Sequence, residues 1–175
     1  MIRLTFGLFA ATALVAGCAH MSQPEPDGPM ATANLKATKG NSANGYVVFQ
    51  QKGDKVLVSG TVSGLKANAE HGFHVHEKGD CSAPDGMSTG GHFNPGGKPH
   101  GHAGERHVGD MANLKADEHG NATVSYTSDL MKVGSGENDI VGRGLIVHAN
   151  PDDYKTQPTG NAGGRIACAV ITKAP

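Results

Sequence analysis

Two histidines separated by a single residue are the first feature of this sequence that suggests chemistry. His74 and His76 flank Val75 in a segment that also contains Phe73, and valine and phenylalanine favour a β-strand. Alternate residues of a strand project to the same face, so both imidazoles would lie on one face, about 6–7 Å apart at Cα. Each nitrogen need only approach a metal to about 2.0–2.1 Å, so the pair can bind one ion. The alternative is an ordinary half-exposed strand with a polar face.

Further histidines and one aspartate follow at positions without helical periodicity. They lie among glycines and prolines, which is not the setting of core residues. They are His92, His100, His107, Asp110 and His148. Imidazole nitrogen and carboxylate oxygen are common zinc ligands, and imidazole also suits copper. The set therefore favours a metal-binding protein over a chance pair of histidines.

Four motifs in this chain resemble those of a known family, the copper/zinc superoxide dismutases, and in particular its exported bacterial members. The motifs are Gly72-Phe73-His74-Val75-His76-Glu77, Gly91-His92-Phe93-Asn94-Pro95, Glu105-Arg106-His107-Val108-Gly109-Asp110 and Gly160-Asn161-Ala162-Gly163-Gly164-Arg165-Ile166-Ala167-Cys168. They occur in the family's order between about residues 31 and 173. Because several independent motifs agree, the resemblance is specific.

The resemblance implies two adjacent metal sites that share one ligand. The implied copper ligands are His74, His76, His92 and His148, and the implied zinc ligands are His92, His100, His107 and Asp110. His92 would bridge the two ions as an imidazolate. A site with three histidines and one carboxylate is a closed tetrahedral site, as in structural zinc. His100 is preferred at the zinc because it follows His92 by eight residues, as in the family, and His102 is the alternative.

The resemblance also implies roles for residues that do not bind metal. Asp152 matches an aspartate that links a copper histidine to a zinc histidine, and such partners orient the rings. Arg165, three residues before Cys168, matches the arginine that guides the substrate. Many relatives have a lysine where this chain has Pro158, and Lys155 is the nearest cation. His20, His71 and His119 are expected at the surface or in supporting positions.

The implied activity is the dismutation of superoxide. Copper would oxidise one superoxide to dioxygen and reduce a second to hydrogen peroxide, while His92 carries a proton. The chain has 15 Lys and Arg against 16 Asp and Glu, so attraction of the superoxide anion would have to be local, at Arg165. The same balance, without a basic patch, argues against nucleic-acid binding.

Two other functions deserve comparison with the enzyme. An exported copper-binding or copper-buffering protein would be expected to lack the bridging His92, the guiding Arg165 or a zinc ligand, and none is missing. A zinc hydrolase would need an open zinc position, which the number of ligands disfavours. A homodimer is compatible with the sequence, which does not define the oligomeric state.

The beginning of the chain resembles an export signal. Residues 1–17 carry one charge, Arg3, and an apolar run that is too short to span a bilayer, so they are predicted to be a signal peptide. Val15-Ala16-Gly17-Cys18 resembles a bacterial lipobox, which would make Cys18 a lipidated N-terminus, and the alternative is an ordinary cleavage site. Residues 18–30 would be a proline-rich tether. We expect a periplasmic protein anchored to a membrane, and Ala19 favours the outer membrane.

Cysteine number predicts one disulfide. If Cys18 is lipidated, Cys81 and Cys168 remain as an even pair in an exported protein. A bridge between them would tie a long loop to the last strand. The alternative is two buried free thiols.

The rest of the chain, residues 31–175, is predicted to form one all-β domain. Eight segments have strand character, with turn signals at 51–54 and 117–121: 31–38, 45–50, 56–63, 72–76, 111–115, 123–127, 144–149 and 166–172. Together with the resemblance, they predict an eight-stranded Greek-key β-sandwich or barrel. Two long connections, 77–109 and 150–164, are expected to be functional, and the first contains His92, His100 and His107.

Overall fold

The computed structural model describes residues 27–175, and these residues form an all-β fold. Among them the only helical element is one 3-10 turn, η1 (Met87–Thr89), and none of their helices is long and apolar enough to cross a membrane. The predicted signal peptide, Cys18 and most of the predicted tether lie outside the described residues. Strand β1 (Asp27–Ala37) begins four residues before the expected start at Ala31, so the last residues assigned to the tether belong to this strand.

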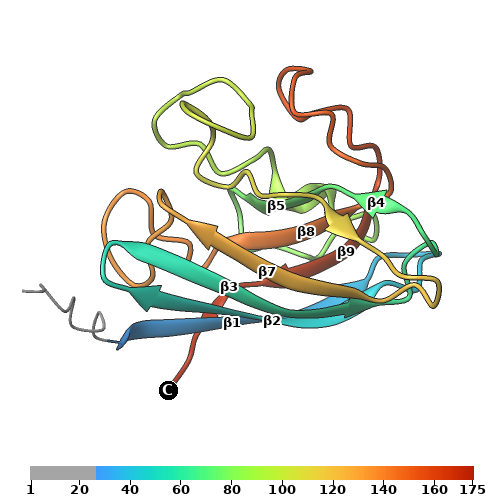
Figure 1. Cartoon of the computed structure of the whole chain (residues 1–175), viewed down its shortest axis with the longest axis horizontal. Coiled ribbons are helices and arrows are strands. Elements are labelled where there is room, and N and C mark those ends of the chain that lie inside the picture. The colour runs from blue at the N-terminus through green and yellow to red at the C-terminus, as the bar shows by residue number, and fades with distance from the viewer. Residues whose placement is uncertain (1–26) are drawn as a thin grey trace, which may run out of the picture.

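Antiparallel strands form one sheet in the order β5-β8-β9-β1-β2-β3-β7, and β10 also pairs with β1 (Figure 1). The remaining long strands are β2 (Asn44–Lys52), β3 (Lys55–Ser63), β5 (Phe73–His76), β7 (Ala122–Ser128), β8 (Gly144–His148) and β9 (Arg165–Val170). Three elements are short: β4 (Glu70–His71), β6 (Leu114–Lys115) and β10 (Thr172–Lys173). Neighbours such as β5 and β8 are distant in sequence, which is the crossing pattern of Greek-key folds.

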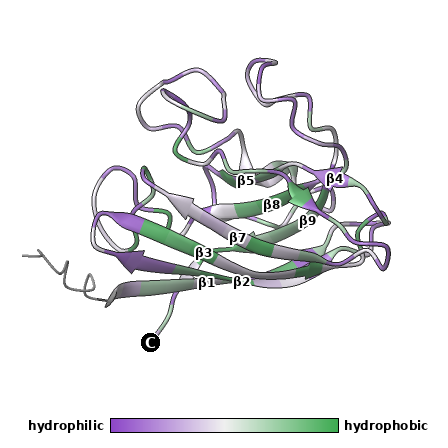
Figure 2. Cartoon of the chain, viewed as in Figure 1, coloured by the Kyte–Doolittle hydropathy of each residue, from purple (hydrophilic) through white to green (hydrophobic). Residues whose placement is uncertain are grey.

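One hydrophobic core lies inside the curled sheet. In β2, Val47 and Phe49 are buried while Tyr46 is exposed, which is the alternation expected of a strand with one face in the core. Phe73 of β5 and Leu145 of β8 pack into the same core from the other half of the sheet. Figure 2 shows the apolar residues along the strands and the hydrophilic residues mainly in the connections. The predicted all-β sandwich is confirmed.

Strands β5 and β8 are buried at every position, unlike β2. Phe73 and Val75 face the core, so the intervening His74 and His76 face the other side, where the long loops cover them. Figure 1 shows these loops rising on the same side of the sheet. The fold therefore places two histidines between a rigid strand and the loops that carry the other expected ligands.

Strand boundaries differ most from the prediction around residues 111–115. Only Leu114 and Lys115 form a strand, β6, which pairs with β4 rather than with the main sheet. Asp110, just before this segment, forms an isolated bridge with His74 of β5.

The predicted disulfide is present. Cys81 and Cys168 are joined with a Cα–Cα distance of 5.9 Å, across 87 positions of sequence. Cys81 lies in the first long loop and Cys168 in β9. The bridge therefore attaches that loop to the sheet.

Candidate metal centre

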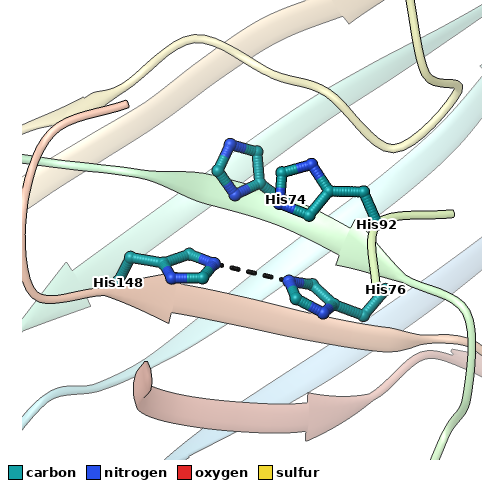
Figure 3. A group of neighbouring side chains, drawn as sticks. All are labelled: His74, His76, His92 and His148. Carbon is teal, nitrogen blue, oxygen red and sulfur yellow. Dashed lines mark hydrogen bonds between the residues drawn. The ribbon is translucent and has the colours of Figure 1, made fainter. Parts of the chain in front are cut away.

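Four buried histidines converge beside strand β5. His74 and His76 project from this strand, and His148 is the last residue of the neighbouring β8. His92 lies in the first long loop, where its backbone forms an isolated β-bridge with His76. All four are at most 4% exposed. Figure 3 shows their rings facing one another. Their candidate ligand nitrogens lie within 4.8 Å of one another.

Backbone carbonyls determine the tautomers of two of these rings. Nδ1 of His76 lies 3.0 Å from the Gly90 carbonyl oxygen, and Nδ1 of His148 lies 3.1 Å from that of Gly163. A carbonyl only accepts, so each Nδ1 donates its proton and each Nε2 carries a lone pair. The two Nε2 atoms lie 3.4 Å apart, along the dashed line in Figure 3. Two facing lone pairs repel unless a proton or a cation lies between them.

The other two rings also direct a free nitrogen toward this space. Nε2 of His74 donates to Oδ2 of Asp152 at 2.8 Å, which leaves its Nδ1 buried without a hydrogen-bond partner. Nε2 of His92 is likewise buried without a partner. Four imidazole lone pairs thus surround one point, and nitrogen-rich coordination of this kind suits copper. The residues fit a copper ion.

A second buried group lies on the other side of His92. It consists of His92, His100, His107 and Asp110, all at most 5% exposed. Nδ1 of His92 lies 2.8 Å from an Asp110 carboxylate oxygen, and the corresponding distances are 3.0 Å for His100 and 3.3 Å for His107. Nδ1 of His100 and of His107 approach this carboxylate without hydrogen-bond geometry. Three nitrogens and one carboxylate fit a tetrahedral zinc ion.

Two side chains connect the groups. His92 directs Nδ1 to Asp110 and leaves Nε2 in the first group. Asp152 accepts from Nε2 of His74 with one oxygen and contacts Nε2 of His100 at 2.9 Å with the other. The carboxylate therefore sets the orientation of one ring in each group.

Burial keeps three imidazoles of the first group, those of His76, His92 and His148, neutral. It lowers the pKa of His148 to about 3 and that of His92 to about 4, and neighbouring histidines contribute to both shifts. Burial also places the pKa of His76 well below its usual range, with further contributions from His92, His148 and Arg165. Neutral imidazole is the form that binds metals. These nitrogens are therefore ready to bind a cation at neutral pH.

Carboxylates reverse this effect in the second group. Burial alone would lower the pKa of His100, but the adjacent carboxylates of Asp110 and Asp152 outweigh burial and raise the pKa to about 9. Burial would also raise the pKa of both carboxyls, but the adjacent histidines hold the pKa of Asp110 and of Asp152 well below the usual range. Negative charge is thus held where a dication would bind.

Arg165 lies next to the first group and is half-buried. Its guanidinium donates to the carbonyl oxygens of Gly86 at 2.9 Å and Gly90 at 2.6 Å, and to Oγ1 of Thr89 at 2.6 Å. Desolvation lowers its pKa, yet it stays a cation because an unperturbed arginine has a pKa above about 12. Its charge acts on both His76 and His148.

His71, His102, His119 and Lys155 lie outside both groups, and His20 lies outside the described residues. His102 is exposed and its ring packs against Tyr154 at 4.5 Å, so it does not share the second group with His100. His119 is exposed in a turn, and Lys155 is exposed in the second long loop. His71 is not at the surface: it is 2% exposed, and its Nδ1 contacts the His148 carbonyl oxygen at 2.8 Å. Its expected supporting role agrees with this contact.

Sequence reasoning missed several residues that hold the site. The Asn113 side chain accepts from the Asp152 backbone N–H at 2.9 Å and donates to its carbonyl at 3.0 Å. Gln157 bonds in the same manner to the backbone of His100. Neither residue carries a metal-ligating group. The dense glycines of 160–164 were the only local signal of close packing.

Comparison with known proteins agrees with this geometry. The sequence model of the family described as copper/zinc superoxide dismutase (SODC) matches residues 43–171. This chain belongs to the copper/zinc superoxide dismutases. It is therefore an oxidoreductase that acts on superoxide, and its cofactors are copper and zinc.

Individual superoxide dismutases are 43–45% identical to this chain over the aligned residues. The Cu-Zn superoxide dismutase 2 of Aquifex aeolicus (strain VF5) is 44% identical over 122 residues, covering 66% of this chain and 71% of the relative. The Cu-Zn superoxide dismutase of Paramecium bursaria Chlorella virus 1 is 43% identical, covering 80% and 82%. That of Brassica juncea, also numbered 2, is 45% identical, covering 79% and 94%.

A solved structure shares the fold as well. The crystal structure of the clock protein EA4 superposes with a TM-score of 0.76 at 41% identity, covering 86% of this chain and 96% of EA4.

Proposed function

We propose that this superoxide dismutase uses a copper ion and a zinc ion joined through the imidazolate of His92. The observation that carries the proposal is the placement of the two ring nitrogens of His92. Nδ1 faces Asp110 in the second group, and Nε2 is buried without a partner in the first. His74, His76 and His148 complete the copper ligands, and His100, His107 and Asp110 complete the zinc ligands.

Copper supplies the one-electron redox chemistry, and the protein supplies ligands, a proton and attraction of the anion. Overall, two superoxide ions and two protons give one dioxygen and one hydrogen peroxide. Nε2 of His92 is the atom that would hold a proton between the two half-reactions, since Nδ1 stays directed to Asp110. The cationic guanidinium of Arg165, next to His76 and His148, would attract superoxide to this side. Lys155 is more exposed than Arg165, so its attraction of superoxide would be more strongly screened by solvent.

The decisive experiment measures metal content and superoxide dismutation together in the full-length protein. We expect one copper and one zinc per chain, full activity, and loss of copper and activity in His148→Ala. His92→Ala should bind both ions more weakly. In protein with Co(II) in place of zinc, this variant should also lose the magnetic coupling of Cu(II) to Co(II), which electron paramagnetic resonance detects. The Gln50→Ala variant, on β2 away from the site, is the control. Uncoupled Cu(II) and Co(II) in the cobalt-substituted wild type would contradict the bridge, and full metallation with copper and zinc but no turnover would indicate a copper-binding protein.

We also propose that the protein is exported and lipid-anchored in the periplasm through Cys18. The apolar residues 1–17, the lipobox-like Val15-Ala16-Gly17-Cys18 and the Cys81–Cys168 disulfide support this location. Fractionation of cells that express the wild type and Cys18→Ser tests it. The wild type should enter the membrane fraction and incorporate labelled fatty acid, and Cys18→Ser should do neither. A cytosolic wild-type protein would contradict export.

A further inference from the structure

The side-chain amide of Gln157 holds the backbone of His100 at two points. The His100 backbone N–H donates to Oε1 of Gln157 at 2.8 Å, and Nε2 of Gln157 donates to the His100 carbonyl oxygen at 2.9 Å. The same Nε2 also lies 3.3 Å from the Lys155 carbonyl oxygen, within its own loop. A carboxamide can make this pair of bonds because it both donates and accepts. A residue of the second long loop thus restrains the backbone of His100, which lies 57 positions earlier in the chain.

This contact is added to two contacts that orient the His100 ring. Nε2 of the ring lies 2.9 Å from Oδ1 of Asp152, and Nδ1 lies 3.0 Å from Oδ2 of Asp110. The next residue, Gly101, donates its backbone N–H to the same Asp110 oxygen at 3.1 Å. Both Asp152 and Gln157 belong to the second long loop. Asp152 orients the His100 ring, and Gln157 hydrogen-bonds to the His100 backbone.

His100 needs such support because of its position in the chain. His92 forms an isolated β-bridge with His76 of β5, and Asp110 forms one with His74 of the same strand. Both residues are therefore fixed to the edge of the main sheet. His100 lies between them in a connection that contains Gly96, Gly97, Gly101 and Gly104 and no strand. A ligand on such a segment leaves readily unless its backbone is restrained, since glycine increases the freedom of the unbound chain.

The copper ligands are held independently of Gln157. Nδ1 of His76 donates to Gly90, and Nδ1 of His148 donates to Gly163. His74 depends on Asp152, whose backbone is held by Asn113. Removing the Gln157 amide should therefore leave the copper ligands in place.

We propose that Gln157 is a positioning residue for zinc: its amide restrains the backbone of His100 and thereby slows zinc release without affecting copper. The proposal rests on the assignment of His100 to zinc made above. Residues that orient ligands typically change metal affinity by about 10–100-fold when they are removed. Because Gln157 is exposed and acts through the backbone, the lower end of this range is expected.

The test measures the release of each metal from the full-length protein, loaded with copper and zinc, to an excess of chelator. Gln157→Ala removes both bonds, and Gln157→Glu keeps the acceptor but places a carboxylate beside the His100 carbonyl oxygen. Gln157→Asn keeps both functions on a shorter arm. Gln50→Ala is the matched control, because Gln50 is an amide that donates to the Gly28 carbonyl oxygen of the neighbouring strand β1. Cobalt(II) in place of zinc gives a visible absorption band that reports the ligand geometry.

Zinc release should be about 10-fold faster in Gln157→Ala and Gln157→Glu, with a smaller effect in Gln157→Asn and none in Gln50→Ala. Copper release should stay within about twofold of wild type, and the cobalt band should shift in the alanine and glutamate variants. Equal acceleration of both metals would show general loosening and overturn the proposal, as would unchanged zinc release. If wild-type protein binds no zinc or gives no tetrahedral cobalt spectrum, the zinc assignment itself fails. If wild type behaves as expected and the variants do not, only the role of Gln157 fails.

Discussion

Arg165 and His76 share one hydrogen-bond acceptor, the carbonyl oxygen of Gly90. The guanidinium donates to it at 2.6 Å, and Nδ1 of the imidazole donates at 3.0 Å. The cation proposed to attract superoxide is thus linked through one backbone atom to a proposed copper ligand. Gly86 and Thr89 hold the guanidinium from the same segment, which the Cys81–Cys168 disulfide ties to β9.

Arg165→Ala should lower kcat/KM and weaken its dependence on salt. Electrostatic steering, of which superoxide dismutases are themselves an example, raises association rates by about 10–1,000-fold and is screened by ions. We expect about a 10-fold loss at low ionic strength and a flatter salt dependence. Arg165→Lys should keep part of the attraction because it keeps the charge but cannot reach all three acceptors. Steady-state rates at several salt concentrations, compared with Lys155→Ala, measure the share of each cation. A salt dependence as steep as that of wild type would rule out Arg165 as the main source of steering.

Gly160→Ala should destabilise the zinc site far more than Gly97→Ala. Both glycines have positive φ, at +67° and +59°, so the backbone strain of an added Cβ is similar. At Gly160, a Cβ would lie 1.8 Å from Oδ1 of Asp152 and 2.6 Å from Nε2 of His100, whereas at Gly97 it would meet nothing within 4 Å. We expect zinc affinity to fall at least 10-fold in the first variant and to stay near wild type in the second. Zinc titration of metal-free protein against a competing chelator measures both.

Removing the disulfide should lower the stability of the domain considerably. Loop-closure entropy for 87 residues corresponds to about 4–5 kcal/mol at 25 °C, an upper estimate because reduced chains retain structure. The Cys81→Ser, Cys168→Ser double variant should show this loss in the free energy of unfolding by urea, measured without metals. The loop that carries Gly90 would also loosen, so Arg165 and His76 should lose their common support. A loss below about 1 kcal/mol would mean that loop packing alone holds this segment.

The metal-free domain should lose stability as the pH falls below about 6.5. The folded pKa of His148 is about 3 and that of His92 about 4, both below the ordinary value of 6.5. Between these values the unfolded chain binds more protons than the folded one, so their contribution is fully present above pH 6.5 and decreases on acidification. His100, with a raised pKa of about 9, has the opposite dependence, and its contribution is lost as the pH rises through 9. Urea midpoints from pH 4.5 to 9.5, with chelator present, should therefore pass through a maximum near neutrality. In the His148→Asn variant, the urea midpoint should fall less steeply as the pH is lowered. A wild-type midpoint that does not change between pH 7 and 5 would contradict the lowered pKa values of His148 and His92.

The sequence alone predicted the β-sandwich, the disulfide and the residues that gather at the metal groups. Period-two alternation in segments such as 45–50 predicts strands because one face must enter the core. His74 and His76 could be assigned to one face for the same reason. The other metal-binding residues were recognised because their motifs are specific.

Only the tertiary structure decided which ring nitrogens face the metal groups, that His102 packs on Tyr154 instead of joining His100, and that residue 27 already belongs to the sheet. It also revealed Gln157, which no motif marked. These features depend on contacts between residues far apart in the chain, such as the 57 positions between His100 and Gln157. The contact of Gln157 with the His100 backbone exists only where the two long loops meet, and that meeting depends on tertiary packing rather than on local sequence.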